Sequence, residues 1–108
     1  MKTAIAIKEA STQSRLDKHF GKSAFFLILD DITKQTEVFE NPSKAVCECK
    51  GNMIINVLIQ KGVKRVIAGD FGTHVQQLLN KHHIQMIIHP DEKVSLSDII
   101  LLLIQKTD

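Results

Sequence analysis

The chain has 108 residues, of which 44% are hydrophobic and 24% are charged, and its formal net charge is +2. This length suits a single domain, residues 1–108, with one core. The small net charge and the 5% aromatic content, without Trp or Tyr, argue against a nucleic-acid-binding surface. No apolar run approaches the ~20 residues of a membrane span, and the N-terminus does not resemble a signal peptide, so we expect a cytoplasmic protein.

The first part of the chain predicts three β-strands. Residues 3–7 alternate weakly between apolar and polar side chains, as in a strand. The apolar run 24–30 predicts a buried strand. Asp30 and Asp31 predict a turn, and the alternating residues 35–39 predict a third strand, so the second and third strands form a hairpin.

The second part of the chain alternates helices with strands. Apolar residues recur at helical spacing over 52–60, and Gly62 stands where a glycine commonly ends a helix. The later elements are, in chain order, a strand at 63–68, a helix at 73–81 capped by Thr73, a strand at 84–88 and a helix at about 95–106 that opens on a capping-box pattern.

The order β-β-β-α-β-α-β-α predicts an α/β fold, with a mixed five-stranded sheet flanked by helices as in the ribonuclease H-like motif. The second strand is expected to run antiparallel to the other four. Ligands of open α/β sheets bind at the carboxyl edge of the parallel strands. The side chains expected at that edge are His19, Cys47, Cys49, His74 and His89, and those expected at the opposite edge are His82 and His83.

His19 and Gly21 stand at the mouth of the buried strand, after a long polar connection. Imidazole is a common metal ligand, and a glycine lets the backbone approach a bound group closely. The alternative is a surface histidine that caps a turn or bonds a carbonyl group. We treat His19 as a candidate metal ligand and both residues as candidates for binding a cofactor.

Cys47 and Cys49 are the two cysteines of the chain, and one residue separates them. A disulfide between positions i and i+2 is strained, so free thiols are expected in a reducing compartment. Thiolates are the ligands of iron–sulfur clusters, which generally use about four of them, so a second copy or non-protein ligands would have to complete a cluster. Zinc held with two histidines, or two thiols without a role, are the alternatives.

The segment Gly69-Asp70-Phe71-Gly72 separates a predicted strand from a predicted helix. The amides at the start of such a helix can hold an anion, so Gly69 and Gly72 are candidate cofactor-binding residues. The alternative is a plain tight turn. The spacing of the glycines matches neither a nucleotide-binding P-loop nor a dinucleotide-binding motif.

Three features together resemble the dinitrogenase iron–molybdenum cofactor biosynthesis family, which includes NifX-like proteins and the C-terminal domain of NifB-like proteins. These are the element His19-Phe20-Gly21 before a buried strand, the loop 69–72 and the order of elements over about 2–103. The resemblance implies a carrier of an iron–sulfur cluster or of an iron–molybdenum cofactor precursor, working with cofactor-assembly or acceptor proteins. It also implies that His19 helps to hold the cargo, whereas Cys47 and Cys49 are proposed from their chemistry alone.

An enzymatic function is not expected. A nuclease with this strand order needs a metal-binding Asp in the first strand, and residues 3–7 contain no carboxylate. No nucleophile motif of the Gly-x-Ser-x-Gly kind occurs either. The alternative to a carrier is a metal-free regulatory or protein-interaction module.

Residues 99–104 are apolar over more than one helical turn. A surface helix needs only one apolar stripe, so something must cover both sides of this segment. Burial within the chain, against the helix 73–81 and the sheet, is favoured here. A homodimer through residues 99–104 is the alternative.

Overall fold

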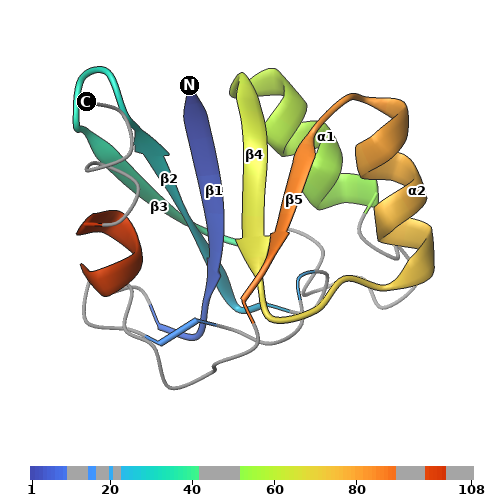
Figure 1. Ribbon diagram of the computed structural model, residues 1–108, viewed down its shortest axis with the longest axis horizontal. Helices are drawn as coiled ribbons and strands as arrows, with labels where there is room; N and C mark the ends of the chain where they lie inside the picture. Colours follow the sequence, from blue (N-terminus) through green and yellow to red (C-terminus); the bar gives the residue numbers. More distant parts are fainter. Residues whose placement is uncertain (10–14, 17–19, 21–22, 42–51, 90–96, 102–108) are drawn as a thin grey trace.

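The computed structural model describes residues 1–9, 15–16, 20, 23–41, 52–89 and 97–101 (Figure 1). Its elements are, in chain order, β1 (Lys2–Ile7), β2 (Phe25–Asp30), β3 (Thr36–Glu40), α1 (Asn52–Gln60), β4 (Val63–Ala68), α2 (Thr73–Lys81) and β5 (Gln85–Ile88). Residues 97–101 form one further helical turn. Across these ranges, no helix combines the length and the hydropathy needed to cross a membrane.

The five strands form one sheet in the order β3-β2-β1-β4-β5. β2 is antiparallel to β1 and β3, while β1 is parallel to β4 and β4 is parallel to β5. The predicted mixed α/β sheet is therefore confirmed, including the direction of every strand. The ribonuclease H-like designation stays a prediction.

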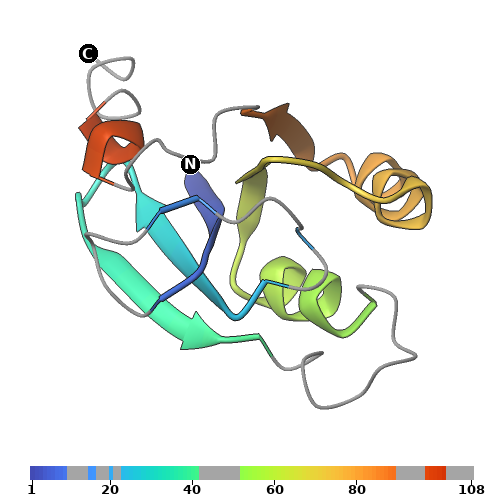
Figure 2. The same ribbon diagram turned by 90° about the horizontal axis from the view of Figure 1, so that it is seen from below.

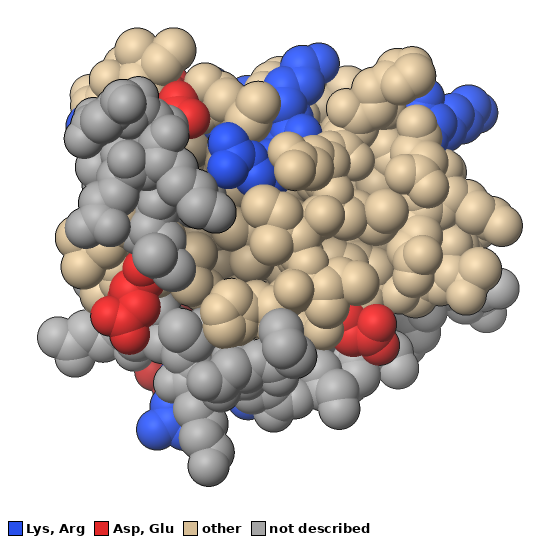
Figure 3. All heavy atoms as spheres, viewed as in Figure 1, with Lys and Arg blue, Asp and Glu red and all other residues tan. Residues whose placement is uncertain are grey.

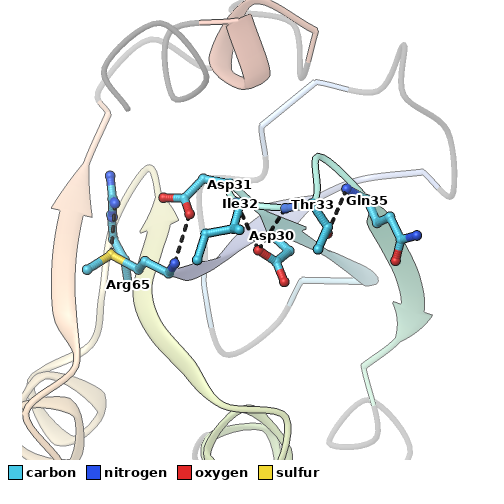
Figure 4. A network of polar contacts seen from close by, with 7 residues as sticks. Asp30, Asp31, Ile32, Thr33, Gln35 and Arg65 are labelled. Carbon is cyan, nitrogen blue, oxygen red and sulfur yellow. Dashed lines mark hydrogen bonds and ion pairs between the residues drawn. The ribbon is translucent and has the colours of Figure 1, made fainter. Parts of the chain in front are cut away.

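The hairpin between β2 and β3 is closed by a short turn (Figure 4). The carboxylate of Asp30 accepts hydrogen bonds from the amides of Ile32 (3.0 Å) and Thr33 (3.4 Å). Lys34 adopts a left-handed φ of 64°. This turn displaces the third strand to Thr36–Glu40, one residue beyond the predicted 35–39. The amide of Ile32, followed by that of Thr33 and the positive charges nearby, holds the pKa of Asp30 below its ordinary value.

The start of β1 is tied to the same turn. The amino group of Met1 contacts the carboxylate of Asp31 at 2.8 Å, and the amide of Asp31 donates to the carbonyl of Met1 at 3.2 Å. Arg65 on β4 directs its guanidinium to the sulfur of Met1 (Figure 4). These contacts join β1, β2 and β4 at the edge where β1 and β4 begin.

Each face of the sheet has its own hydrophobic core. Figure 2 shows α1 and α2 on one face and the C-terminal helical turn on the other. The core on the α1 and α2 face consists of Ala4, Ala6, Phe20, Phe26, Ile28, Ile54, Ile55, Leu58, Val63, Val66, Ala68, Phe71, Val75, Leu79 and Ile84. The core on the other face consists of Ile5, Ile7, Leu16, Leu27, Leu29, Ile67 and Ile99. Both faces of the central strands are thus shielded from water, which explains why 24–30 reads as a continuous apolar run.

The C-terminal helical turn packs on the second face. Ile99 is buried there, Ile100 packs against the same core, and Leu101 is 56% exposed. The expectation that this segment is buried by the sheet is correct for Ile99. For the described residues 99–101, the expected contact with the helix 73–81 is wrong, because α2 covers the opposite face (Figure 2).

The ends of the helices follow the sequence in one case and depart from it in another. Gly62 after α1 has a φ of 80°, as predicted for a glycine that ends a helix. At the start of α2 the N-cap residue is Gly72, with φ −62° and ψ 155°, and no side chain of the described residues makes a capping hydrogen bond there. The predicted N-cap Thr73 is instead the first helical residue.

β3 forms one edge of the sheet, and charged side chains surround it. The ammonium group of Lys61 lies 2.6 Å from the carboxylate of Glu37 and 5.4 Å from the ring centre of Phe39. Four of the five β3 residues are exposed, and Phe39 is half-buried.

Candidate functional site

The carboxyl ends of β1, β3, β4 and β5 meet at one edge of the sheet, together with the start of β2 (Figure 1). Of the predicted site residues, Gly69 and Gly72 lie at this edge. His19, Gly21, Cys47 and Cys49 lie outside the described residues, so their roles stay predictions. The site can nevertheless be built from the described residues that flank them.

Phe20 is fixed in place by backbone and side-chain contacts together. Its amide donates a hydrogen bond to the carbonyl of Asp70 at 3.3 Å. Its ring is 1% exposed and lies 5.2 Å, centre to centre, from the rings of both Phe26 and Phe71. Aromatic pairs at this separation are stabilising beyond the area that they bury. Phe20 therefore joins the connection after β1 to the loop after β4.

The loop between β4 and α2 is held from inside. The carboxylate of Asp70 accepts a hydrogen bond from the amide of Phe71 at 2.8 Å, and the side-chain amide of Gln76 donates to the carbonyl of Phe71 at 2.8 Å. Phe71 is buried, whereas Asp70 and Gly72 are exposed. One buried ring thus anchors the loop, while Asp70 and Gly72 remain accessible at its surface.

Gly72 leaves space at the start of α2. A Cβ atom built on it would meet no atom within 4 Å, and its φ of −62° suits any residue. The first turn of α2 carries no acidic side chain. A side chain would therefore fit at this position, and the positive end of the helix dipole at this edge favours an approaching anion.

The described histidines fall on the edges that the strand order predicts. His89 directly follows β5, and its amide donates to the carbonyl of Ala68 at 2.9 Å. His74 lies in the first turn of α2, and both are at the carboxyl edge. His82 and His83 are exposed in the turn before β5, at the opposite edge. His83 has a φ of 57° and the next residue, Ile84, still bonds back to α2, so β5 starts one residue later than predicted.

The described residues alone do not supply a complete set of metal ligands. Within the ranges that the structure describes, no group of three or more His, Cys, Asp or Glu side chains could hold a metal ion. A metal site at the carboxyl edge would therefore depend on the predicted ligands His19, Cys47 and Cys49. At the opposite edge, where β1 and β4 begin, Figure 3 shows a group of Lys and Arg side chains.

Two buried polar residues at this edge, Ser23 and Asn41, are not predicted from the sequence. Ser23 precedes the apolar run of β2, and Asn41 precedes a proline, which marks a boundary but not a buried role. Their roles follow from hydrogen bonds to distant parts of the chain, from Ser23 to Ile7 and from Asn41 to Ser23.

The solved structures that share this fold include the following three. The apo form of the orange protein (ORP) from Desulfovibrio gigas has a TM-score of 0.86 at 20% identity, covering 97% of this chain and 88% of that chain. The crystal structure of PH0822 has a TM-score of 0.78 at 26% identity, covering 98% and 92%. The NMR structure of a Thermotoga protein (TM1290), named as a candidate NifB protein of the DUF35 family, has a TM-score of 0.78 at 20% identity, covering 97% and 87%.

A search of curated proteins gives no significant match. The family model described as dinitrogenase iron-molybdenum cofactor matches residues 1–106, which is nearly the whole sequence. The predicted resemblance is thereby confirmed: the chain belongs to the dinitrogenase iron-molybdenum cofactor family.

Proposed function

We propose that this protein is a non-catalytic carrier that binds an iron–sulfur cluster or an iron–sulfur-based precursor of the iron–molybdenum cofactor. Family membership supports a role connected with this cofactor. The observation that carries the proposal is the hydrogen bond from Phe20 to Asp70 at the carboxyl edge. This hydrogen bond attaches Phe20, the residue that follows His19, to the loop that precedes α2.

The Phe20 contact supports a binding site because it joins two different kinds of binding group. His19 directly precedes Phe20 in the sequence and offers an imidazole ligand. The Gly69–Gly72 loop and the start of α2 offer backbone amides and the positive end of a helix dipole. A cluster carrying anionic sulfides or an organic acid needs both a metal ligand and a partner for its negative charge. The carboxyl edge supplies candidates for both.

The thiols extend the same reasoning. Cys47 and Cys49 lie in the sequence between Asn41, which follows β3, and Asn52, which begins α1. Thiolates are the ligands of iron–sulfur clusters, and the positive charge of Lys50 directly follows Cys49 in the sequence. We propose Cys47 and Cys49 as additional ligands. The remaining positions on the iron would belong to the cargo's own sulfides or to a second protein.

A carrier must also release its cargo. Ligation by a few side chains of one chain leaves part of a cluster's coordination to groups outside that chain, which suits transfer by ligand exchange. The partners would be cofactor-assembly proteins that load the carrier and acceptor proteins that unload it. Catalysis has no part in this proposal.

The test is anaerobic loading, with iron and sulfide in one arm and a preformed synthetic cluster with labile thiolate ligands in the other. The expected product is coloured, with thiolate-to-iron charge-transfer absorption and bound iron that survives gel filtration. His19→Ala should weaken retention of iron, and Cys47→Ser with Cys49→Ser should weaken it further. The matched control is His82→Ala, an exposed histidine at the opposite edge, which should load like the wild type.

A colourless, iron-free product in both arms would contradict the carrier proposal. The protein would then be better described as a metal-free regulatory or interaction module of the same fold. Equal retention by His19→Ala and His82→Ala would instead retain a carrier but remove His19 from its site.

A further inference from the structure

Ser23 and Asn41 are buried polar residues at the carboxyl edge, with side chains that connect three strands. They are 0% and 2% exposed. Burial of a polar side chain costs free energy unless its hydrogen bonds are made. An apolar side chain at either position would need no hydrogen bonds. The presence of two polar residues here therefore requires an explanation, which their hydrogen bonds provide.

Ser23 joins β2 to β1. Its hydroxyl lies 2.9 Å from the carbonyl oxygen of Ile7, the last residue of β1, and 2.8 Å from that of Phe25, the first residue of β2. A hydroxyl group has one hydrogen to donate, so these two carbonyls share it. The end of β1 and the start of β2 are thereby held together through one side chain.

Asn41 joins β3 to the same point. Its side-chain amide donates to the carbonyl of Ser23 at 2.8 Å, and its backbone amide donates to the carbonyl of Ala24 at 3.0 Å. The regular pairing of β1 with β2 and of β2 with β3 ends at Phe25. Ser23 and Asn41 lie just beyond, so side chains continue the connection after the backbone ladder has stopped.

We propose that Ser23 and Asn41 are positioning residues that hold the ends of β1, β2 and β3 at a fixed separation for cargo binding; this inference rests on the proposed carrier function. In the sequence, His19 lies between the end of β1 and Ser23, and Cys47 and Cys49 follow Asn41. The Ser23–Asn41 pair thus ties the point where the histidine-bearing segment ends to the point where the thiol-bearing segment begins.

The physical effect is preorganisation. Metal ligands bind well when supporting hydrogen bonds hold them to within about 0.5 Å of the productive geometry. If the strand ends separate, the cargo must bring the two segments together, and that ordering reduces affinity. Loss of the pair should therefore weaken binding beyond what the loss of folding stability alone would cause.

The experiment compares Ser23→Ala and Asn41→Leu with Thr3→Val. Thr3 is 2% exposed and lies on β1 near the opposite edge, so its substitution also alters a buried polar position but leaves the carboxyl edge intact. Each variant is titrated anaerobically with the synthetic iron–sulfur cluster. Retained iron gives the apparent affinity, and the electron paramagnetic resonance spectrum of the reduced cluster reports the ligand geometry. Urea unfolding gives the stability of each variant.

We expect the apparent affinity of Ser23→Ala and Asn41→Leu to fall about tenfold, the equivalent of one buried hydrogen bond, with a broadened resonance spectrum. Thr3→Val should keep the wild-type affinity and spectrum. Should Asn41→Leu fail to fold, Ser23→Ala decides, since it removes a single hydroxyl group. Variants that load like the wild type, or a Thr3→Val protein that weakens equally, would overturn this inference alone. A wild type that takes up no cluster would overturn the carrier proposal and this inference with it.

Discussion

The amide of Phe20 and the carbonyl of Asp70 form a hydrogen bond of 3.3 Å between two segments that are far apart in the sequence. One segment joins β1 to β2, and the other joins β4 to α2. Parallel strands bring their loops to a common edge, but they do not specify which residues touch. Here the packing of the buried Phe20 ring on Phe71, beside the hydrogen bond, determines which residues of the two loops are in contact.

The Phe20 anchor predicts a large loss of stability on truncation. Phe20→Ala removes a ring that is 1% exposed and should lower the free energy of unfolding by about 3–5 kcal/mol. Phe39→Ala is the comparison, since Phe39 is half-buried and should cost clearly less. Urea unfolding followed by far-ultraviolet circular dichroism measures both. Equal losses would show that the ring of Phe20 is not the stronger anchor.

Substitutions of Gly72 should affect the stability of α2 and the binding of cargo in different ways. Gly72→Asp should stabilise α2 by about 0.5 kcal/mol, because aspartate caps a helix better than glycine and favours its dipole. The same charge should repel an anionic cargo and weaken cluster loading. Gly72→Asn adds a neutral cap at the same position and should load like the wild type. If both variants load equally well, the start of α2 does not hold the cargo.

Asp30 predicts a pH-dependent contribution to stability. Its pKa is lowered in the folded state, chiefly by the amide of Ile32, so the carboxylate stabilises the fold above the pKa of the unfolded chain. This contribution is lost as the pH falls through the lowered folded-state value. The wild type should therefore exceed Asp30→Asn in stability at pH 7, and the difference should shrink in strong acid. A difference that is constant between pH 7 and strong acid would contradict the assignment.

The substitution Leu101→Glu tests whether the protein forms a homodimer through residues 99–104. Ile99 is buried by the chain's own sheet, which reduces the apolar surface left for a second copy. We therefore expect a monomer at micromolar concentration in sedimentation velocity, with Leu101→Glu unchanged. A wild-type dimer that Leu101→Glu dissociates would show that residues 99–104 form the homodimer interface, and a dimer would also bring a second pair of thiols.

The sequence predicts the sheet well because its apolar pattern is strong and local. The bounds 52–60, 63–68 and 73–81 agree with α1, β4 and α2. β1, β2 and β5 differ from the prediction by one residue at one end, and β3 is shifted by one residue at both ends. The errors arise where distant or backbone geometry decides. Thr73 has the side chain of a cap, but ψ at the preceding residue makes Gly72 the N-cap.

The candidate site is harder to predict for the same reason. Ser23 bonds a carbonyl group on β1 and Asn41 bonds the carbonyl group of Ser23, and no spacing in the sequence encodes such partners. The apolar segment after residue 96 likewise indicates burial without indicating which face of the sheet receives it. His19, Cys47 and Cys49 stay predictions, supported by the chemistry of their side chains and by the residues that flank them.

The exposed strand β3 also affects how the protein behaves when it is concentrated. An edge strand offers backbone amides and carbonyls that can pair with a neighbouring molecule, and charged side chains discourage that pairing. Glu37 and Glu40 place negative charges along β3, and Lys61 crosses Phe39. Replacing both glutamates with valine would turn the strand into Thr-Val-Val-Phe-Val. The folded core would change little, but the molecule would acquire an uncharged, strongly β-forming edge and should aggregate at concentrations that the wild type tolerates.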